Sequence, residues 1–145
     1  MSRIVHIVIP GNPRPLERHR SRVISGPKGA YVQNYETAAN KHAKENIAKH
    51  AIAALRSSGQ MRAFDGPLHV TFLFAMERPV TRPKSRPMPD SKPDFDNCEK
   101  LVLDALNGVV WNDDAQITDW SGKKRYDPNP RTEIIVRPLT AAEAV

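Results

Sequence analysis

The chain has 145 residues, of which 22 are Lys or Arg and 16 are Asp or Glu, so its formal net charge is +6. This length is typical of one domain with a hydrophobic core, and the positive charge favours a polyanionic partner. The single cysteine, Cys98, excludes an internal disulfide, and no apolar run reaches the roughly 20 residues of a membrane span. We therefore expect one soluble, cytoplasmic domain over residues 1–145, with no membrane contact.

Three segments in the first half of the chain carry the hydrophobic pattern of regular secondary structure. Ile4–Ile9 is a β-branched run that ends at Pro10-Gly11 and predicts a buried strand. From Tyr35 to about Arg56, apolar residues recur at every fourth position and predict an amphipathic helix. Leu68–Met76 predicts a second buried strand.

Two proline-broken, basic segments lie beside these elements, and each is expected to be a loop. Residues 10–22 contain one acidic residue, Glu17, and the prolines of residues 78–92 favour an extended, partly mobile arm. Such segments are often only solvated loops, but the basic chain favours contacts with a nucleic-acid backbone. The predicted contacts are Arg14, Arg18, Arg20, Arg22, Lys84 and Arg86, joined by Lys123 and Lys124 before a last strand predicted over Thr132–Arg137.

The most informative segment, residues 92–116, contains two pairs of carboxylates. Asp94 and Asp96 form a D-x-D pair, and Asp113 and Asp114 follow after a predicted helix and a short predicted strand, Val109–Trp111. Carboxylates that share one site repel one another unless a cation neutralises them or one binds a proton. Oxygen ligands favour a hard ion such as Mg²⁺, which often keeps water and phosphate ligands. On a basic chain, this pattern indicates metal-assisted phosphodiester chemistry.

The local pattern around the first pair predicts how its side chains are presented. If residues 94–96 are extended, both carboxylates lie on one face and Phe95 points to the core. Asp96 then fits the N-cap of a helix, and Glu99 completes a capping box. Lys100 lies one turn further on, so its ammonium can return towards the carboxylates. The expected apolar face is Leu103 and Leu106, with Val102 at its margin, and Asn107-Gly108 ends the helix.

A purely structural interpretation is open for each of these residues alone. Asp96 can be only a helix cap, and Lys100 only an i,i+4 ion-pair partner worth about 0.2–0.5 kcal/mol. Asp113 and Asp114 are ordinary turn residues. The combination of two returning acidic pairs with a lysine favours a site. A zinc cluster and a P-loop are absent from the sequence, and Cys98 is expected to be a small buried residue.

KPDFDNCEKLVLDALNG followed by VWNDDAQI resembles the RusA-type Holliday junction resolvases, most densely over about Lys92–Lys124. Upstream, the G-x-P of Gly11–Pro13 and the arginines Arg18 and Arg20 are similar to the basic N-terminal segment of that family. Cys98 departs from the pattern, because the family usually has an aliphatic residue there.

The resemblance implies an α+β domain, in which a small mixed β-sheet is packed with helices, and a homodimer. It implies an endonuclease that resolves four-way DNA junctions by paired symmetric nicks in recombination and repair, using Mg²⁺ with Mn²⁺ as a substitute. The implied catalytic residues are Asp94, Asp96, Lys100 and Asp114; the metal ligands are Asp94, Asp96 and Asp114, with Asp113 assisting or only capping the turn. Two alternatives stay open: a non-catalytic module that binds branched DNA, and a metal nuclease that acts on flaps or forks.

Overall fold

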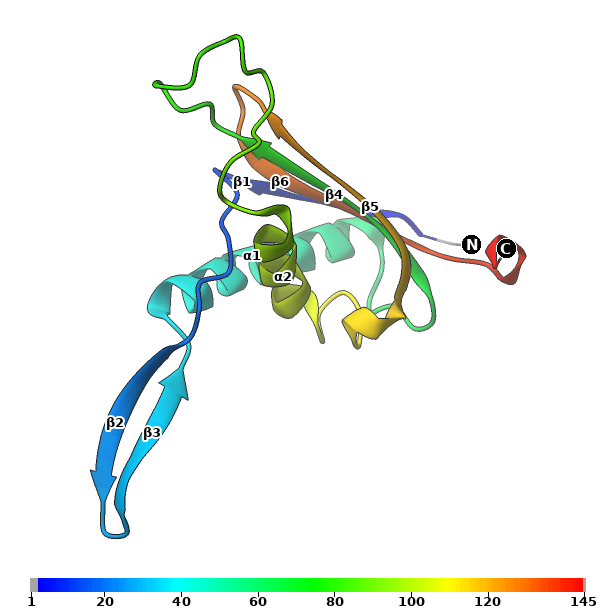
Figure 1. The fold of residues 1–145 in the computed structure, drawn as a ribbon. Coiled ribbons are helices and arrows are strands. Elements are labelled where there is room, and N and C mark those ends of the chain that lie inside the picture. Colours follow the sequence, from blue (N-terminus) through cyan, green and yellow to red (C-terminus); the bar gives the residue numbers. More distant parts are fainter. Residues whose placement is uncertain (1–2, 145) are drawn as a thin grey trace.

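A four-stranded sheet with two helices on one face forms the body of the molecule (Figure 1). The computed structural model describes residues 3–144. The sheet order is β1-β6-β4-β5, where β4 and β5 are parallel and the other two pairings are antiparallel. The elements of the body are β1 (Val5–Pro10), α1 (Ala38–Ser58), β4 (Leu68–Met76), α2 (Phe95–Leu106), β5 (Ile117–Tyr126) and β6 (Arg131–Pro138). This mixed sheet with its helices confirms the predicted α+β class.

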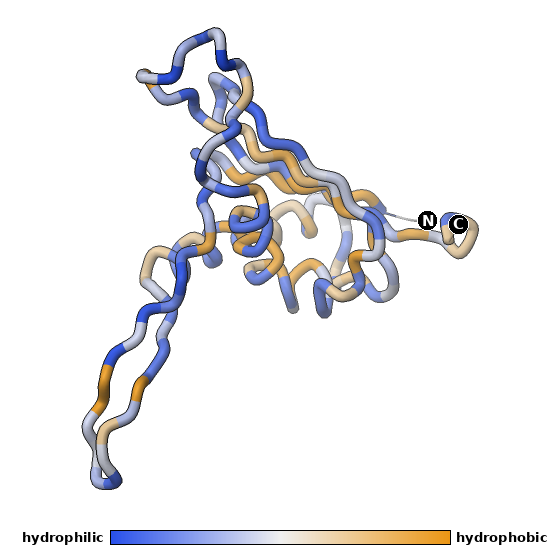
Figure 2. The backbone as a smooth tube through the Cα atoms, in the orientation of Figure 1, coloured by the Kyte–Doolittle hydropathy of each residue, from blue (hydrophilic) through white to orange (hydrophobic). Residues whose placement is uncertain are grey.

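The core lies between the sheet and the helices. There, the alternate residues of the strands that face inward pack against the apolar stripe of α1. In β1, Val5, Ile7 and Ile9 are buried and the residues between them are exposed. In α1, four residues of the predicted apolar stripe are buried and Ala39 is only partly buried; the four are Ala43, Ile47, Ala51 and Leu55. Thr37 caps the start of α1 by accepting a hydrogen bond from the Asn40 N–H (3.2 Å). Figure 2 shows apolar residues along the strands and helices of the body, whereas the loop above the sheet is mostly hydrophilic.

Two predicted elements around α2 require correction. Val109–Trp111 is not a strand: the N–H groups of Val109 and Val110 both donate to the Leu106 carbonyl, so the chain turns directly after α2. Trp111 is fully buried, and its indole N–H donates to the Asn107 side chain (2.7 Å). The segment therefore has apolar residues because it fills the core. The strand that does return to the sheet is β5, which the sequence did not predict.

The first basic segment is also not a loop throughout. Arg20 and Arg22 lie in β2 (Arg20–Gly26), which pairs with β3 (Gly29–Tyr35) as a separate two-stranded antiparallel sheet. This hairpin projects away from the body (Figure 1).

The second basic segment, residues 78–92, contains no helix or strand, as predicted, but it is not an extended arm. The Arg78 guanidinium donates to the carbonyls of Pro83 and Arg86, and it lies 4.8 Å from the centre of the Tyr126 ring. Arg82 forms an ion pair with Asp90. These contacts fold the segment into a compact loop above the sheet. None of the helices in the described residues is long and apolar enough to span a membrane.

Candidate active site

Helix α2 begins one residue after Asp94, which is its N-cap. The Asp94 carboxylate makes no capping hydrogen bond; it forms an ion pair with the Lys92 ammonium instead (2.8 Å). Asp96 lies in the first turn of the helix, so the predictions of an extended D-x-D segment and of a capping box from Asp96 to Glu99 are wrong. Because α2 is already helical at Phe95, Asp96, Glu99 and Lys100 lie at i, i+3 and i+4 and share one face.

Packing of Phe95 explains why the helix begins there. Its ring meets the Phe74 ring edge-on with centroids 5.3 Å apart, and it lies against Gly122 of β5, where an added Cβ would clash with the ring. A β-carbon at position 122 would push the start of α2 away from the sheet. A second contact comes from Lys124, whose ammonium donates to the carbonyls of Ser91 (2.9 Å) and Pro93 (2.8 Å). Strand β5 thus holds the segment that carries Asp94.

The buried face of α2 differs from the prediction by a rotation of the helix. Val102 is buried and Leu103 is only partly buried, although the sequence placed Val102 at the margin. The remaining buried residues of α2 are Cys98, Leu101, Ala105 and Leu106. Cys98 is fully buried, as predicted, and burial raises the pKa of its thiol to about 11. A thiol with this pKa is protonated at neutral pH, so Cys98 does not act as a nucleophile.

The two residues of the second acidic pair, Asp113 and Asp114, have different surroundings. Asp113 is the N-cap of a short 3-10 turn, Asp114–Gln116, and its carboxylate accepts a hydrogen bond from the Ala115 N–H (3.3 Å). The Gln116 side chain completes this cap by accepting from the Asp113 N–H (2.9 Å). Asp114 instead lines a cavity of about 210 Å³ together with Glu99, Leu103 and Trp120. The structure therefore brings Asp114, rather than Asp113, to the acidic face of α2.

Glu99 is a carboxylate of this cavity that the sequence assigned only to a cap. Burial, followed by repulsion from the Asp96 carboxylate, raises the pKa of the Glu99 carboxyl. In the sequence, Glu99 lies three residues after Asp96 and next to Lys100. This spacing places Glu99 on the same helix face as Asp96 only if the helix begins before Asp96, and the sequence did not predict that start. Lys100 and Asp96 are exposed at the surface of the same face.

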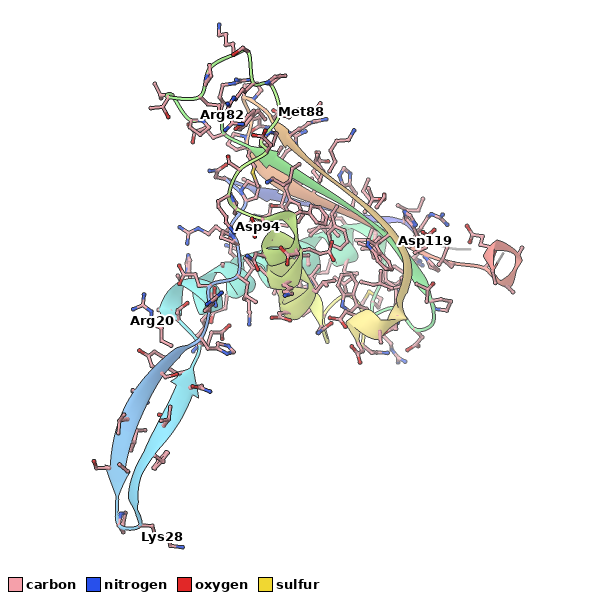
Figure 3. All side chains as sticks on the ribbon, viewed as in Figure 1. Arg20, Lys28, Arg82, Met88, Asp94 and Asp119 are labelled. Carbon is pink, nitrogen blue, oxygen red and sulfur yellow. The ribbon has the colours of Figure 1, made fainter. Side chains whose placement is uncertain are left out.

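The basic N-terminal segment is attached to this acidic region by hydrogen bonds. The Leu16 N–H donates to the Asn97 carbonyl in the first turns of α2 (2.9 Å). The buried Asn40 side chain accepts from the Glu17 N–H (2.8 Å) and donates to the Glu17 carbonyl (2.7 Å). These bonds bring Arg18 to the rim of a cavity that Asp94 and Asn97 also line. Figure 3 shows Asp94 between the loop that bears Arg82 and the base of the hairpin at Arg20.

The other predicted basic contacts are dispersed over four parts of the chain. Arg14, Lys84, Arg86 and Lys123 have exposed side chains, which are available to a ligand. Lys124 is partly buried and bonded to the segment before α2, so it has a structural contact that the sequence did not indicate. Arg20 and Arg22 lie on the hairpin rather than beside the carboxylates.

The carboxylates are not gathered into a single cluster: within residues 3–144, no three acidic, histidine or cysteine side chains are grouped as metal ligands. The assignment of Asp94, Asp96, Asp114 and Asp113 as ligands stays a prediction. The available donors do fit Mg²⁺, because all are oxygens and because this ion commonly uses one or two protein carboxylates. Asp94 and Asp96 also lie at the N-terminus of α2, where the helix dipole favours negative charge and bound anions.

Comparison with known proteins gives a family match over most of the chain. The family described as Endodeoxyribonuclease RusA matches residues 10–137. An uncharacterized protein YqaN of Bacillus subtilis (strain 168) is 43% identical over 53 residues, which covers 37% of this chain and 37% of that protein. Two solved structures are only distantly similar. A 2C-methyl-D-erythritol 2,4-cyclodiphosphate synthase from Plasmodium vivax aligns over 94% of this chain and 95% of its own, with 8% identity and a TM-score of 0.37. An IspF–CDP complex from Plasmodium falciparum aligns over 94% and 93%, with 11% identity and a TM-score of 0.32.

Proposed function

Because the chain belongs to the RusA endodeoxyribonuclease family, we propose that it is a Mg²⁺-dependent endonuclease that resolves four-way DNA junctions by paired symmetric nicks. The family acts on branched DNA, and the net charge of +6 suits a polyanionic substrate. One observation carries the proposal furthest: the basic N-terminal segment is hydrogen-bonded to the first turns of α2, which bear Asp94 and Asp96. Groups that attract phosphate thus lie beside the carboxylates that we assign to the cation.

In this proposal Asp94, Asp96 and Asp114 hold the ion, and Asp113 remains a cap of its turn. Bound Mg²⁺ would supply Lewis-acid stabilisation of the phosphate and an activated water. The N–H groups at the start of α2 orient the scissile phosphate, and Lys100 adds positive charge where negative charge develops. Arg14 and Arg18 bind the flanking phosphates, which positions the strand without selecting a sequence.

A homodimer is part of the proposal. Two active sites related by a twofold axis suit a substrate that needs two symmetric nicks. Both points can be tested with the purified protein on a labelled immobile four-way junction. Paired symmetric nicks would support the dimer, and cleavage with Mg²⁺ or Mn²⁺ but not without them would support the use of a metal ion.

The first test is the Asp96→Asn variant, which removes a charge at the start of α2 without changing side-chain size. We expect it to bind the junction and to lose cleavage. Asp104→Asn is the matched control, because Asp104 is an exposed aspartate on the same helix beyond the proposed site. Cleavage by Asp96→Asn at the rate of this control would refute the assignment. Preferential cutting of a flap by the unchanged protein would keep the metal site and change the substrate.

A further inference from the structure

The hairpin β2–β3 is the part of the molecule that the proposed active site leaves unexplained. It forms its own two-stranded sheet, and it projects from the body with its tip far from α2 (Figure 1). An isolated hairpin is at best marginally stable in water. Both strands of this one contain hydrophobic residues (Figure 2), and Val23 and Val32 are 70% and 67% exposed. A structure of this kind is expected to gain order from a partner.

The strand register gives the two faces of the hairpin different chemistry. Residues paired across an antiparallel ladder point to the same face, and successive residues point to opposite faces. One face is basic and aromatic: Arg20 pairs with Tyr35, Arg22 with Gln33, and Ile24 with Tyr31. The other face is small and uncharged: Ser21 pairs with Asn34, Val23 with Val32, and Ser25 with Ala30.

On the basic and aromatic face, Arg22 contacts its neighbours, whereas the Tyr31 ring is exposed. The Arg22 guanidinium lies 5.3 Å from the centre of the Tyr35 ring, and its Nε donates to Gln33 (2.8 Å). Tyr31 lies nearer the tip and is 55% exposed. The next pair on that face is Gly26 and Gly29, and neither residue has a side chain that could cover the ring.

The charge of the hairpin selects the class of partner. From Arg18 to Tyr35 the sequence contains Arg18, Arg20, Arg22 and Lys28 and no acidic residue. Arg20 lies at the base of the hairpin and Lys28 at its tip (Figure 3), so positive charge runs along an arm about 20 Å long. Such an arm attracts a polyanion, whereas two copies of it would repel each other.

We propose that β2–β3 is a DNA-binding arm, in which Tyr31 stacks on an unstacked base at a branch point while Arg20, Arg22 and Lys28 bind the neighbouring phosphates. Base–aromatic stacking beside cationic side chains is the common mode of binding unpaired nucleotides. A continuous duplex offers no free base face, so the Tyr31 contact favours branched DNA over linear DNA. This inference deepens the proposed function and rests on it.

The test uses the full chain and a four-way junction with 2-aminopurine at the branch point, beside a linear duplex with the same label. We expect the unchanged protein to alter the junction fluorescence, and Tyr31→Ala to abolish that change and weaken junction binding about fivefold or more. Tyr31→Phe keeps the ring and should restore both signals. Val32→Thr is the control, because Val32 is the neighbouring residue on the opposite face and is 67% exposed.

The outcomes separate the two proposals. If the unchanged protein binds and cuts the junction but Tyr31→Ala behaves like Val32→Thr, the DNA-binding role of the hairpin is wrong and the proposed function stands. If Tyr31→Ala changes the oligomeric state in gel filtration, the hairpin contacts a second copy and the DNA assignment is overturned. If the unchanged protein shows no preference for the junction over the duplex, the proposed function fails and the inference fails with it.

Discussion

The attachment of the basic segment to α1 through Asn40 can be tested by replacing one side chain. Asn40→Ala removes two hydrogen bonds to the backbone of Glu17. Each is worth about 0.5–1.5 kcal/mol net, so their loss costs about 1–3 kcal/mol. Alanine is the better helix former by about 0.5 kcal/mol, which offsets part of that loss. We therefore expect the free energy of unfolding to fall by about 0.5–2.5 kcal/mol.

The assay is urea denaturation followed by circular dichroism, combined with junction binding at several salt concentrations. Release of residues 16–18 should also weaken binding, because Arg18 is then no longer held beside the first turn of α2. Asn46→Ala is the control, since it makes the same chemical change at a half-buried position of the same helix. A loss below about 0.5 kcal/mol for Asn40→Ala, or one equal to that of the control, would refute the role assigned to Asn40.

Three further predictions concern the elements that hold the site. Gly122→Ala should destabilise the fold by about 1–3 kcal/mol, because its β-carbon meets the Phe95 ring; an unchanged thermal midpoint would contradict this packing. Lys124→Met should reduce junction cleavage more than Lys123→Met, because only Lys124 is bonded to the backbone before α2 in the structure; equal rates would count against that role. The Cys98 thiol keeps its proton in the folded state up to a pKa of about 11, whereas the unfolded thiol loses it near 9, so stability should fall between pH 9 and 11 by up to about 1.4 kcal/mol per pH unit. Urea denaturation across that range should show a smaller decline for Cys98→Ala, and an equal decline would exclude the thiol as its cause.

The elements that could be predicted from the sequence are those in which one hydrophobic period continues without interruption. Leu68–Met76 has the predicted bounds, Ile4–Ile9 is shifted by one residue to Val5–Pro10, and Thr132–Arg137 is extended by one residue at each end. Each is covered on one face by helices, so burial and sequence pattern agree.

Elements whose residues are mostly exposed could not be predicted in this way. Strand β5 lies at the edge of the sheet and is polar along most of its length, and the hairpin β2–β3 has two solvent-facing sides. Neither shows a hydrophobic alternation. Val109–Trp111 gave the opposite error, because its apolar residues fill the core from a turn.

The candidate site was predictable in composition but not in arrangement. The segment that carries Asp94, Asp96, Lys100 and Asp114 stood out from the sequence alone. Two aspartates two residues apart are equally suitable N-caps, and packing of Phe95 between Phe74 and Gly122 decides between them. Because Asp94 rather than Asp96 is the N-cap, Glu99 does not complete a capping box, and it lines the same cavity as Asp114.

The most direct measurement is incubation of the purified protein with an immobile four-way junction labelled on each strand, with and without Mg²⁺, beside a linear duplex of matched sequence. We expect paired nicks at symmetric positions on the junction, only when Mg²⁺ is present, and no nicks in the duplex. Junction binding without cleavage in either Mg²⁺ or Mn²⁺ would contradict the proposed nuclease and indicate a module that only binds branched DNA.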